Sequence, residues 1–338
     1  MLDITDDQAL KQYVINKELA SKPEDVSTRE LGGGVSCSVV KVTTPKHAFV
    51  LKQALPKLKV QEDWFADIQR IFTEAACLKV CHELVPDAVP DLLFTDDDHC
   101  LLAMDAAPEG VAMWKSQLLS GRIDFQTGQK VVRALIDIHN ATYENDEIEA
   151  KFEDKDIFIQ LRIDPYLRTV AERHPSLKKA VDEEIEYILS MKQTLVHGDY
   201  SPKNILVEKE RIYILDFEVA HFGDPAFDVA FLSNHLLLKS IKHKQWAAAY
   251  LNLLTYMTGI YFRSARISAP ELEKHTLKVL AFLFLARVDG KSPVEYITAE
   301  QDKQLIRKLS YKMISNNIQT FQELRELVNQ EVSSVNKA

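Results

Sequence analysis

The sequence predicts an α+β protein with a small strand-rich N-terminal part and a larger, mostly helical C-terminal part. Short apolar runs at 26–31, 35–42 and 49–52, separated by turn residues, predict antiparallel strands. From residue 112 onward, apolar residues recur with helical spacing, most clearly over 272–288. A chain of 338 residues is long enough for two parts that each bury a core.

Composition narrows the class of protein. Hydrophobic residues make up 46% and charged residues 27%, as in ordinary globular proteins. The net charge of −9 disfavours nucleic acid as a partner. The acidic first residues have no signal-peptide core, and no apolar stretch is long enough to span a bilayer, so we expect no membrane association. The four cysteines contain no Cys-x-x-Cys pair, which fits a reducing cytoplasm. We expect a monomer or a homodimer.

Three glycines, Gly32, Gly33 and Gly34, separate the first two predicted strands. Glycine lets backbone amides approach phosphate oxygens closely. Ser36 and Ser38 follow and offer hydroxyl donors. The segment is a candidate phosphate-binding turn, although a glycine run by itself is more typical of a flexible turn.

Lys52 ends an apolar strand, where a charge is costly without a partner. A helix predicted over 67–81 places Glu74 on its apolar stripe. We therefore expect an ion pair between Lys52 and Glu74 that positions nucleotide phosphates. The alternative is a surface lysine and a half-exposed glutamate.

A short apolar strand at 101–104 is followed by a segment with Pro108 and Gly110, which is typical of a boundary. We therefore expect a nucleotide-binding lobe over 1–107 and a catalytic and substrate lobe over 108–338. Asp105 and Ala107 in the linker are candidates for contacting an adenine edge.

The run from His197 to Asn204 leads into a predicted hairpin, 205–207 and 212–215, that ends at Asp216. Because a hairpin returns to its starting point, the side chains of Asn204 and Asp216 should lie close together. Their oxygens are suitable ligands for Mg²⁺. Asp199, on the loop before the hairpin, is placed to accept a proton from an alcohol.

A buried acid is also predicted after the hairpin. Asp228 lies among apolar residues and needs donors, which the backbone amides of 197–204 would supply. Asp224 is a candidate cap for the helix that follows.

These motifs together resemble the aminoglycoside phosphotransferase / choline kinase-like family, which has a two-lobed protein-kinase-like fold and phosphorylates small molecules. The resemblance implies that Asp199 is the catalytic base and that Asn204 and Asp216 hold Mg²⁺. It also implies that Lys52, paired with Glu74, contacts the α- and β-phosphates of ATP. The segment 51–56 is in addition similar to the methylthioribose kinases within this family.

The resulting hypothesis is transfer of the γ-phosphate of Mg-ATP to a hydroxyl of a sugar, amino sugar or amino alcohol, a methylthioribose-like acceptor included. Four residues are candidates for the acceptor pocket: Trp114, Glu218, His221 and Arg287. The alternatives are a non-catalytic ATP-binding pseudokinase, a metal hydrolase centred on His197 and Asp199, and a protein kinase. The last is disfavoured because the segment between Asp216 and Asp228 has no room for a long activation loop.

Overall fold

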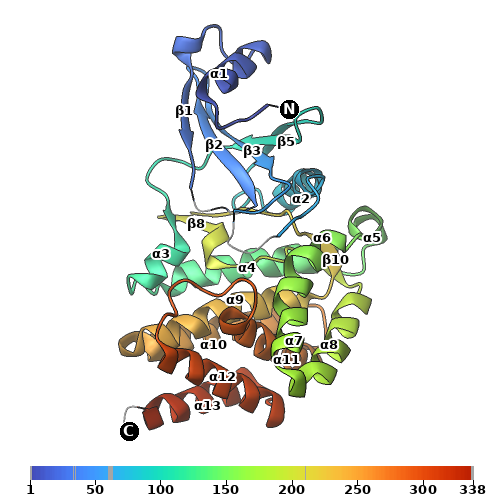
Figure 1. Ribbon diagram of the computed structural model, residues 1–338, viewed down its shortest axis with the longest axis vertical. Coiled ribbons are helices and arrows are strands. Elements are labelled where there is room, and N and C mark those ends of the chain that lie inside the picture. The colour runs from blue at the N-terminus through green and yellow to red at the C-terminus, as the bar shows by residue number, and fades with distance from the viewer. Residues whose placement is uncertain (1, 33, 35, 60–63, 210, 336–338) are drawn as a thin grey trace. The chain divides into compact units, whose positions relative to one another are not determined.

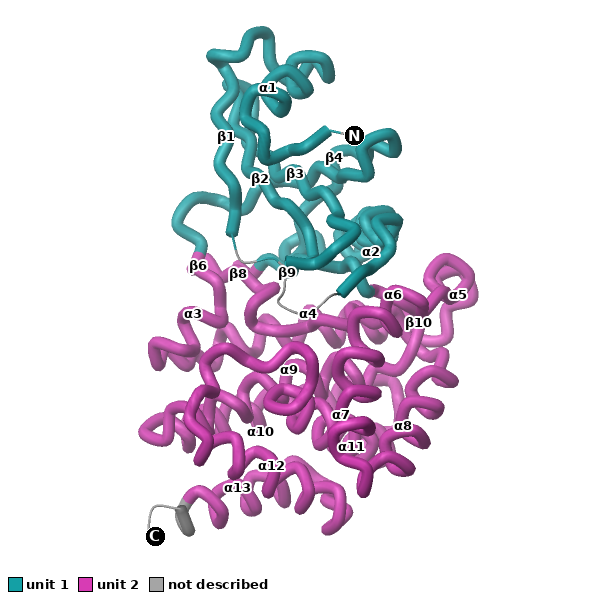
Figure 2. The backbone as a smooth tube through the Cα atoms, viewed as in Figure 1, with its two compact units in different colours: residues 1–111, 213–219 teal, residues 112–212, 220–338 magenta. Residues whose placement is uncertain are grey.

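The computed structural model describes all residues except 1, 33, 35, 60–63, 210 and 336–338. The chain folds into two compact units (Figure 2). Unit 1 consists of residues 1–111 and 213–219, and unit 2 of residues 112–212 and 220–338. We expected the first boundary after residue 107, and the first segment of unit 1 ends four residues later, at residue 111. The return of 213–219 to unit 1 was not anticipated from the sequence.

Unit 1 is built on a five-stranded antiparallel sheet with the order β1-β2-β3-β5-β4 (Figure 1). The strands are β1 (Ser27–Glu30), β2 (Cys37–Thr43), β3 (Ala48–Ala54), β4 (Leu92–Asp96) and β5 (Leu101–Asp105). The three predicted N-terminal strands and the strand at 101–104 are confirmed as β1, β2, β3 and β5. β3 is central and almost fully buried, so Lys52 lies inside the unit and not on its surface.

Two helices accompany the sheet of unit 1. α1 (Asp7–Asn16) is capped by the side chain of Asp6, which accepts hydrogen bonds from two backbone amides of the first turn. Its buried face joins a core with β2, β3 and β5. α2 (Arg70–Leu84) is the predicted helix, and it starts three residues later than the apolar periodicity suggested. Its buried stripe contains Glu74, which brings this acid toward the sheet.

Unit 2 is mostly helical, as predicted (Figure 1). Its first helices are α3 (Trp114–Leu119), α4 (Phe125–Thr142), α5 (Asp146–Phe152), α6 (Asp156–Phe158), the π-helical η2 (Ile159–Arg168), α7 (Thr169–Arg173) and α8 (Lys178–Ser190). After the hairpin come α9 (Pro225–Lys242), α10 (Ala247–Ser264), α11 (Ala269–Asp289), α12 (Glu300–Ser315) and α13 (Phe321–Val335). Short 3-10 turns are η1 (Pro23–Asp25) in unit 1, and η3 (Pro175–Leu177), η4 (Pro202–Asn204) and η5 (Lys244–Trp246) in unit 2.

Short strands flank the loop between residues 196 and 205 in unit 2. β7 (Thr194–Val196) pairs with β10 (His221–Gly223), and β6 (Ala112–Met113) pairs with β8 (Ile205–Glu208). β9 (Arg211–Ile214) completes the predicted hairpin next to β8. The chain passes from unit 2 into unit 1 within β9.

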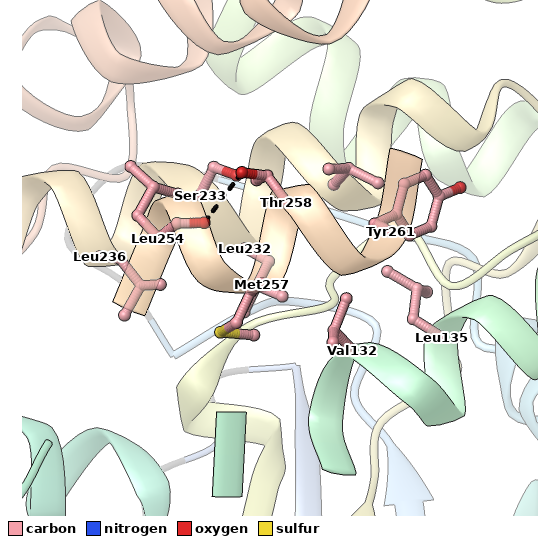
Figure 3. A pocket seen from close by; sticks show the side chains of 10 residues that line it. Val132, Leu135, Leu232, Ser233, Leu236, Leu254, Met257, Thr258 and Tyr261 are labelled. Carbon is pink, nitrogen blue, oxygen red and sulfur yellow. Dashed lines mark hydrogen bonds between the residues drawn. The ribbon is translucent and has the colours of Figure 1, made fainter. Parts of the chain in front are cut away.

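α9 is the central helix of unit 2, and every residue from 225 to 241 is buried. A helix that is apolar on all sides is expected where other helices surround it, and α10 and α11 pack against it. A small cavity of about 10 Å³ lies between α4, α9 and α10 (Figure 3). It has the size of a single water molecule and an apolar lining of residues such as Val132, Leu232 and Met257, so it is a packing defect of the core. Every described helix is too short or too polar to cross a bilayer.

Candidate active site

The loop after β7 is held rigidly by a buried carboxylate of α9. Asp228 is fully buried, and its two oxygens accept hydrogen bonds from the backbone N–H groups of His197 (2.7 Å) and Gly198 (2.8 Å). This is the arrangement predicted from the sequence. His139 from α4 lies 3.3 Å from the same carboxylate. Burial favours the neutral acid, but the contacts with His139 and His197 outweigh it and lower the pKa of Asp228, which stays ionised.

Asp199, at the centre of this loop, is 1% exposed and lies between two cations. Its Oδ2 is 2.8 Å from Nη2 of Arg162 and 2.8 Å from Nζ of Lys203. Its backbone N–H donates to Nδ1 of His197, and the amide of Asn204 donates to its carbonyl oxygen at 3.0 Å. The structure therefore brings the predicted base and one predicted metal ligand together within unit 2.

Arg162 was missed by the sequence analysis. It lies on η2, a π-helical segment that contains Pro165, and it is 7% exposed. Its Nε also donates to the carbonyl of Gly198 at 2.8 Å, so one guanidinium holds both the backbone and the carboxylate of the loop. The signal available in the sequence was a basic residue between two apolar neighbours, close to a proline. The π-helical geometry is a structural indication, because such turns are frequent at functional sites.

Unit 1 carries a second cluster around Lys52. Its Nζ is 2.7 Å from Glu74 and 2.5 Å from Asp216, so the expected ion pair is present and has a second acid. Burial would lower the pKa of Lys52, but Asp216 and Glu74 outweigh it and raise that pKa well above its usual value. Burial raises the pKa of Glu74 to about 7. Asp216 adopts a positive φ of 72°, a conformation that is uncommon outside glycine and often found at functional sites.

Arg70 binds the backbone that follows the glycine turn. It is fully buried on α2, and its guanidinium donates to Glu218 at 2.9 Å and to the carbonyl of Ser36 at 2.6 Å. Glu218, which the sequence analysis named as a candidate for the acceptor pocket, is thus paired with the buried Arg70 inside unit 1. This pairing favours a positioning role for Glu218, because it orients the guanidinium that binds the carbonyl of Ser36 after the glycine turn.

Gly32 and Gly34 of the predicted glycine turn are exposed. Gly32 and Gly34 have open space around the position of a Cβ, with only the carbonyl of Cys37 at 3.8 Å from that of Gly34. The hydroxyl-bearing Ser36 and Ser38 are buried at its end. Gly33 lies outside the described residues.

The other predicted residues lie outside these two clusters. Asp105 is exposed at the end of β5, and Ala107 is half-buried on the segment that follows. Trp114 is fully buried at the start of α3, the helix that packs against η4. His221 is buried on β10, where its ring stacks on Phe158 with centroids 4.0 Å apart.

The donor chemistry fits magnesium. Asn204 uses its amide nitrogen for Asp199, which leaves Oδ1 without a hydrogen-bond partner among the residues described. Asp216 offers a carboxylate. Mg²⁺ binds few protein ligands of this hard oxygen type when nucleotide phosphates and water fill its remaining coordination positions. The described part of the chain has no cluster of three His, Cys, Asp or Glu side chains arranged as a metal site.

Comparison with known proteins decides the family. The model of the phosphotransferase enzyme family matches residues 27–260. The chain belongs to this family. Methylthioribose kinase of Bacillus cereus is 25% identical over 291 residues, which cover 78% of this chain and 72% of the relative. That of Bacillus thuringiensis is 22% identical over 280 residues, 74% and 70% of the two chains.

Solved structures of phosphotransferases share the fold. A choline/ethanolamine kinase family protein from Mesorhizobium loti has a TM-score of 0.52 at 14% identity, over 90% of this chain and 92% of that one. An amicoumacin kinase in complex with AMP-PNP, Ca²⁺ and Ami has a TM-score of 0.51 at 14% identity, over 93% and 96%. The α+β, two-lobed kinase-like fold expected from the sequence is confirmed. The chain is a small-molecule kinase of this phosphotransferase family.

Proposed function

We propose that this phosphotransferase moves the γ-phosphate of Mg-ATP to a hydroxyl group of a small metabolite, with Asp199 as the base. The observation that carries the proposal is the state of Asp199: a buried carboxylate on a loop that Asp228 and Arg162 fix through its backbone. A fixed carboxylate can orient a hydroxyl in line with a phosphoryl group, and orientation supplies much of the rate in such reactions.

The two cations beside Asp199 define its role further. Arg162 and Lys203 both contact Oδ2, and such neighbours favour the ionised carboxylate. A carboxylate suits phosphoryl transfer, because the loose transition state of that reaction needs little proton removal before the phosphorus–oxygen bond breaks. In this mechanism Asp199 accepts the hydroxyl proton late, and the cations counter negative charge that builds up near the transferring group.

Lys52 would neutralise the α- and β-phosphates of ATP. Its pKa is raised, so it stays charged, and Glu74 and Asp216 fix its position at 2.7 Å and 2.5 Å. Asn204 Oδ1 and the carboxylate of Asp216 would hold Mg²⁺. When bound, the ion supplies charge neutralisation to the nucleotide phosphates.

The methylthioribose kinases among the relatives support a sugar hydroxyl as the acceptor group. The nucleotide analogue AMP-PNP in the structure of the amicoumacin kinase supports ATP as the donor. Both inferences concern the class of substrate and not one compound.

The test is Asp199→Asn, which keeps the shape of the side chain and removes its basicity. We expect acceptor-dependent ADP formation to fall by about 10²–10⁴-fold, the usual contribution of a general base, while ADP affinity measured by calorimetry stays within a few-fold. Lys209→Gln is a matched control, because Lys209 lies on the turn between β8 and β9. Asp199→Asn activity within a few-fold of wild type would refute the role of Asp199. Wild-type protein that binds ATP but forms no ADP with any acceptor would instead favour the pseudokinase.

A further inference from the structure

One face of α9 carries a buried cation at the end remote from the catalytic loop. Asp228, Phe231, His235 and Lys239 follow one another at spacings of three and four residues, which places them on one side of the helix. Lys239 is 0% exposed. Its Nζ donates to the carbonyl of His235 at 3.2 Å and lies 5.1 Å from the ring centroid of Tyr296. Among the described residues, no carboxylate forms an ion pair with it.

Arg287, on α11, is a second buried cation without an acid. Its guanidinium donates to the hydroxyl of Tyr166 at 2.8 Å and to the carbonyl of Ser292 at 2.5 Å. Within the described chain it has no carboxylate partner, and its buried Nε makes no hydrogen bond. The hydroxyl of Tyr296 is likewise buried with no hydrogen-bond partner in the described residues. Buried polar groups normally have partners, so these two donors indicate a missing acceptor.

Packed rings connect these cations with the proposed base. The guanidinium of Arg162, which contacts Asp199, lies 6.0 Å from the ring centroid of Tyr166 and 5.7 Å from that of Phe231. Tyr166 receives the hydrogen bond from Arg287, and Phe231 contacts His235 at 5.5 Å. Along α9, the eight residues from Phe231 to Lys239 correspond to about 12 Å at the helical rise. Lys239 therefore lies about 12 Å along the helix from the ring of Phe231 that Arg162 contacts.

The local charge is opposite to that of the whole chain. Asp199 has two cations, and Glu295 is paired with Lys115, so Lys239 and Arg287 are left over. Burial, together with Lys115 and Arg287, lowers the pKa of Lys239 to about 7. In a protein of net charge −9, a buried guanidinium and a buried amine that burial drives toward its neutral form are a considerable cost that apolar residues would avoid. A bound anion would remove that cost.

We propose that Lys239, Arg287 and Tyr296 form a subsite for an oxyanion, a carboxylate or phosphate monoester, carried by the acceptor whose hydroxyl group Asp199 engages. This rests on the proposed function and narrows it, because cationic amino sugars and amino alcohols would be disfavoured. Tyr296 lies on the irregular segment 290–299, so its ring can turn away from Nζ of Lys239 without breaking a helix. The oxyanion then replaces the ring as the partner of the ammonium group.

The test is calorimetry on the full chain saturated with ADP and Mg²⁺, using ribose with ribose 5-phosphate, glucose with gluconate, and glucosamine as the cationic probe. We expect at least one oxyanion to bind ten or more times as tightly as its neutral parent, and glucosamine to bind no better than glucose. Lys239→Met should abolish the difference. Lys242→Met, at a half-buried position on the same helix, should preserve it. Ribose 5-phosphate and gluconate distinguish a phosphate from a carboxylate.

Three outcomes would overturn the subsite: no oxyanion exceeds its neutral parent, the two lysine variants behave alike, or inorganic phosphate binds more tightly than ribose 5-phosphate. A folding defect is separable, because Lys239→Met removes an unpaired buried charge and should leave the unfolding midpoint unchanged or higher; Arg287→Met provides a second variant. Failure of the proposed function has a different signature. In that case Lys239-dependent binding persists, and ADP formation with the bound probe is absent from both wild type and Asp199→Asn.

Discussion

Lys52 illustrates how a buried cation and two acids depend on each other unequally. Among the described residues, the ammonium group of Lys52 is the one cation paired with Glu74, whereas Lys52 is paired with both Glu74 and Asp216. Removing the cation therefore leaves a fully buried acid alone, but removing Glu74 leaves Lys52 with Asp216. Burial raises the pKa of Glu74, so exchanging this acid for a neutral amide removes a charge that the interior disfavours.

We expect Lys52→Met to lower the free energy of unfolding by about 3 kcal/mol, since breaking a buried ion pair on one side costs this much. Glu74→Gln should cost less than about 1 kcal/mol, as for a single neutral hydrogen bond. Urea unfolding at pH 7 measures both. Equal losses for the two variants would contradict this unequal dependence and show that the cluster needs Glu74 as much as Lys52.

At this scale the sequence revealed partners close in the chain and not the distant ones. Glu74 was paired with Lys52 because a charge on an apolar strand and an acid on an apolar helical stripe each need compensation. Arg70 and Glu218 are 148 residues apart, and no local pattern links them. Arg162 was missed for the same reason, since Gly198 and Asp199 become its neighbours only after folding.

At the scale of elements, three helices of unit 2 meet at His275. Asp224 caps α9 as predicted, accepting from the backbone of Ala226. His275 on α11 lies 2.5 Å from Asp224 and 3.2 Å from Glu184 on α8. Burial would lower the pKa of His275, but the two acids outweigh it and raise that pKa.

A raised histidine pKa makes stability depend on pH in a defined direction. The contribution of protonated His275 to the free energy of unfolding is complete at pH values below the ordinary histidine pKa of 6.5. It disappears as the pH rises through the higher pKa that His275 has in the folded state. At pH 6 we expect His275→Gln to cost about 1.5–3 kcal/mol, as for hydrogen bonds to charged groups. The difference from wild type should shrink toward pH 9. Urea unfolding across this range tests it, and a difference independent of pH would contradict the charged state of His275.

The elements themselves were largely predictable. Strands in unit 1 and the long helices of unit 2 follow from apolar periodicity and turn residues. The π-helical geometry of η2 was not predictable, because a local change of hydrogen-bond register leaves no distinct apolar pattern. The start of α2 also shifted, since helix ends depend on contacts as well as on periodicity.

At the scale of the whole molecule, the chain leaves unit 1 near residue 111 and returns to it for residues 213–219. This return delivers Asp216 to Lys52 and Glu218 to Arg70. Unit 1 is thus completed by a segment that follows the catalytic loop in sequence. We infer that nucleotide binding stabilises the folded chain as a whole.

ADP with Mg²⁺ at about a hundred times its dissociation constant should add about 2.7 kcal/mol to the free energy of unfolding. Asp216→Asn and Asn204→Ala should each reduce the part of this gain that depends on Mg²⁺. The measurement is thermal unfolding with ADP, in the presence of Mg²⁺ or of a chelator. A gain that is the same in all three proteins would exclude Asp216 and Asn204 as magnesium ligands.

The sequence by itself determined the α+β class, the phosphotransferase motifs and the pairing of Lys52 with Glu74, because each depends on spacing within one element or between neighbours. Tertiary structure alone decided which distant charges meet, namely Arg162 with Asp199 and Arg70 with Glu218. It also decided that, within the described part of the chain, Lys239 and Arg287 are buried with no acid paired to them. The physical reason is that burial sets the energy of a charge, and burial is a property of the packed molecule and not of a position in the chain.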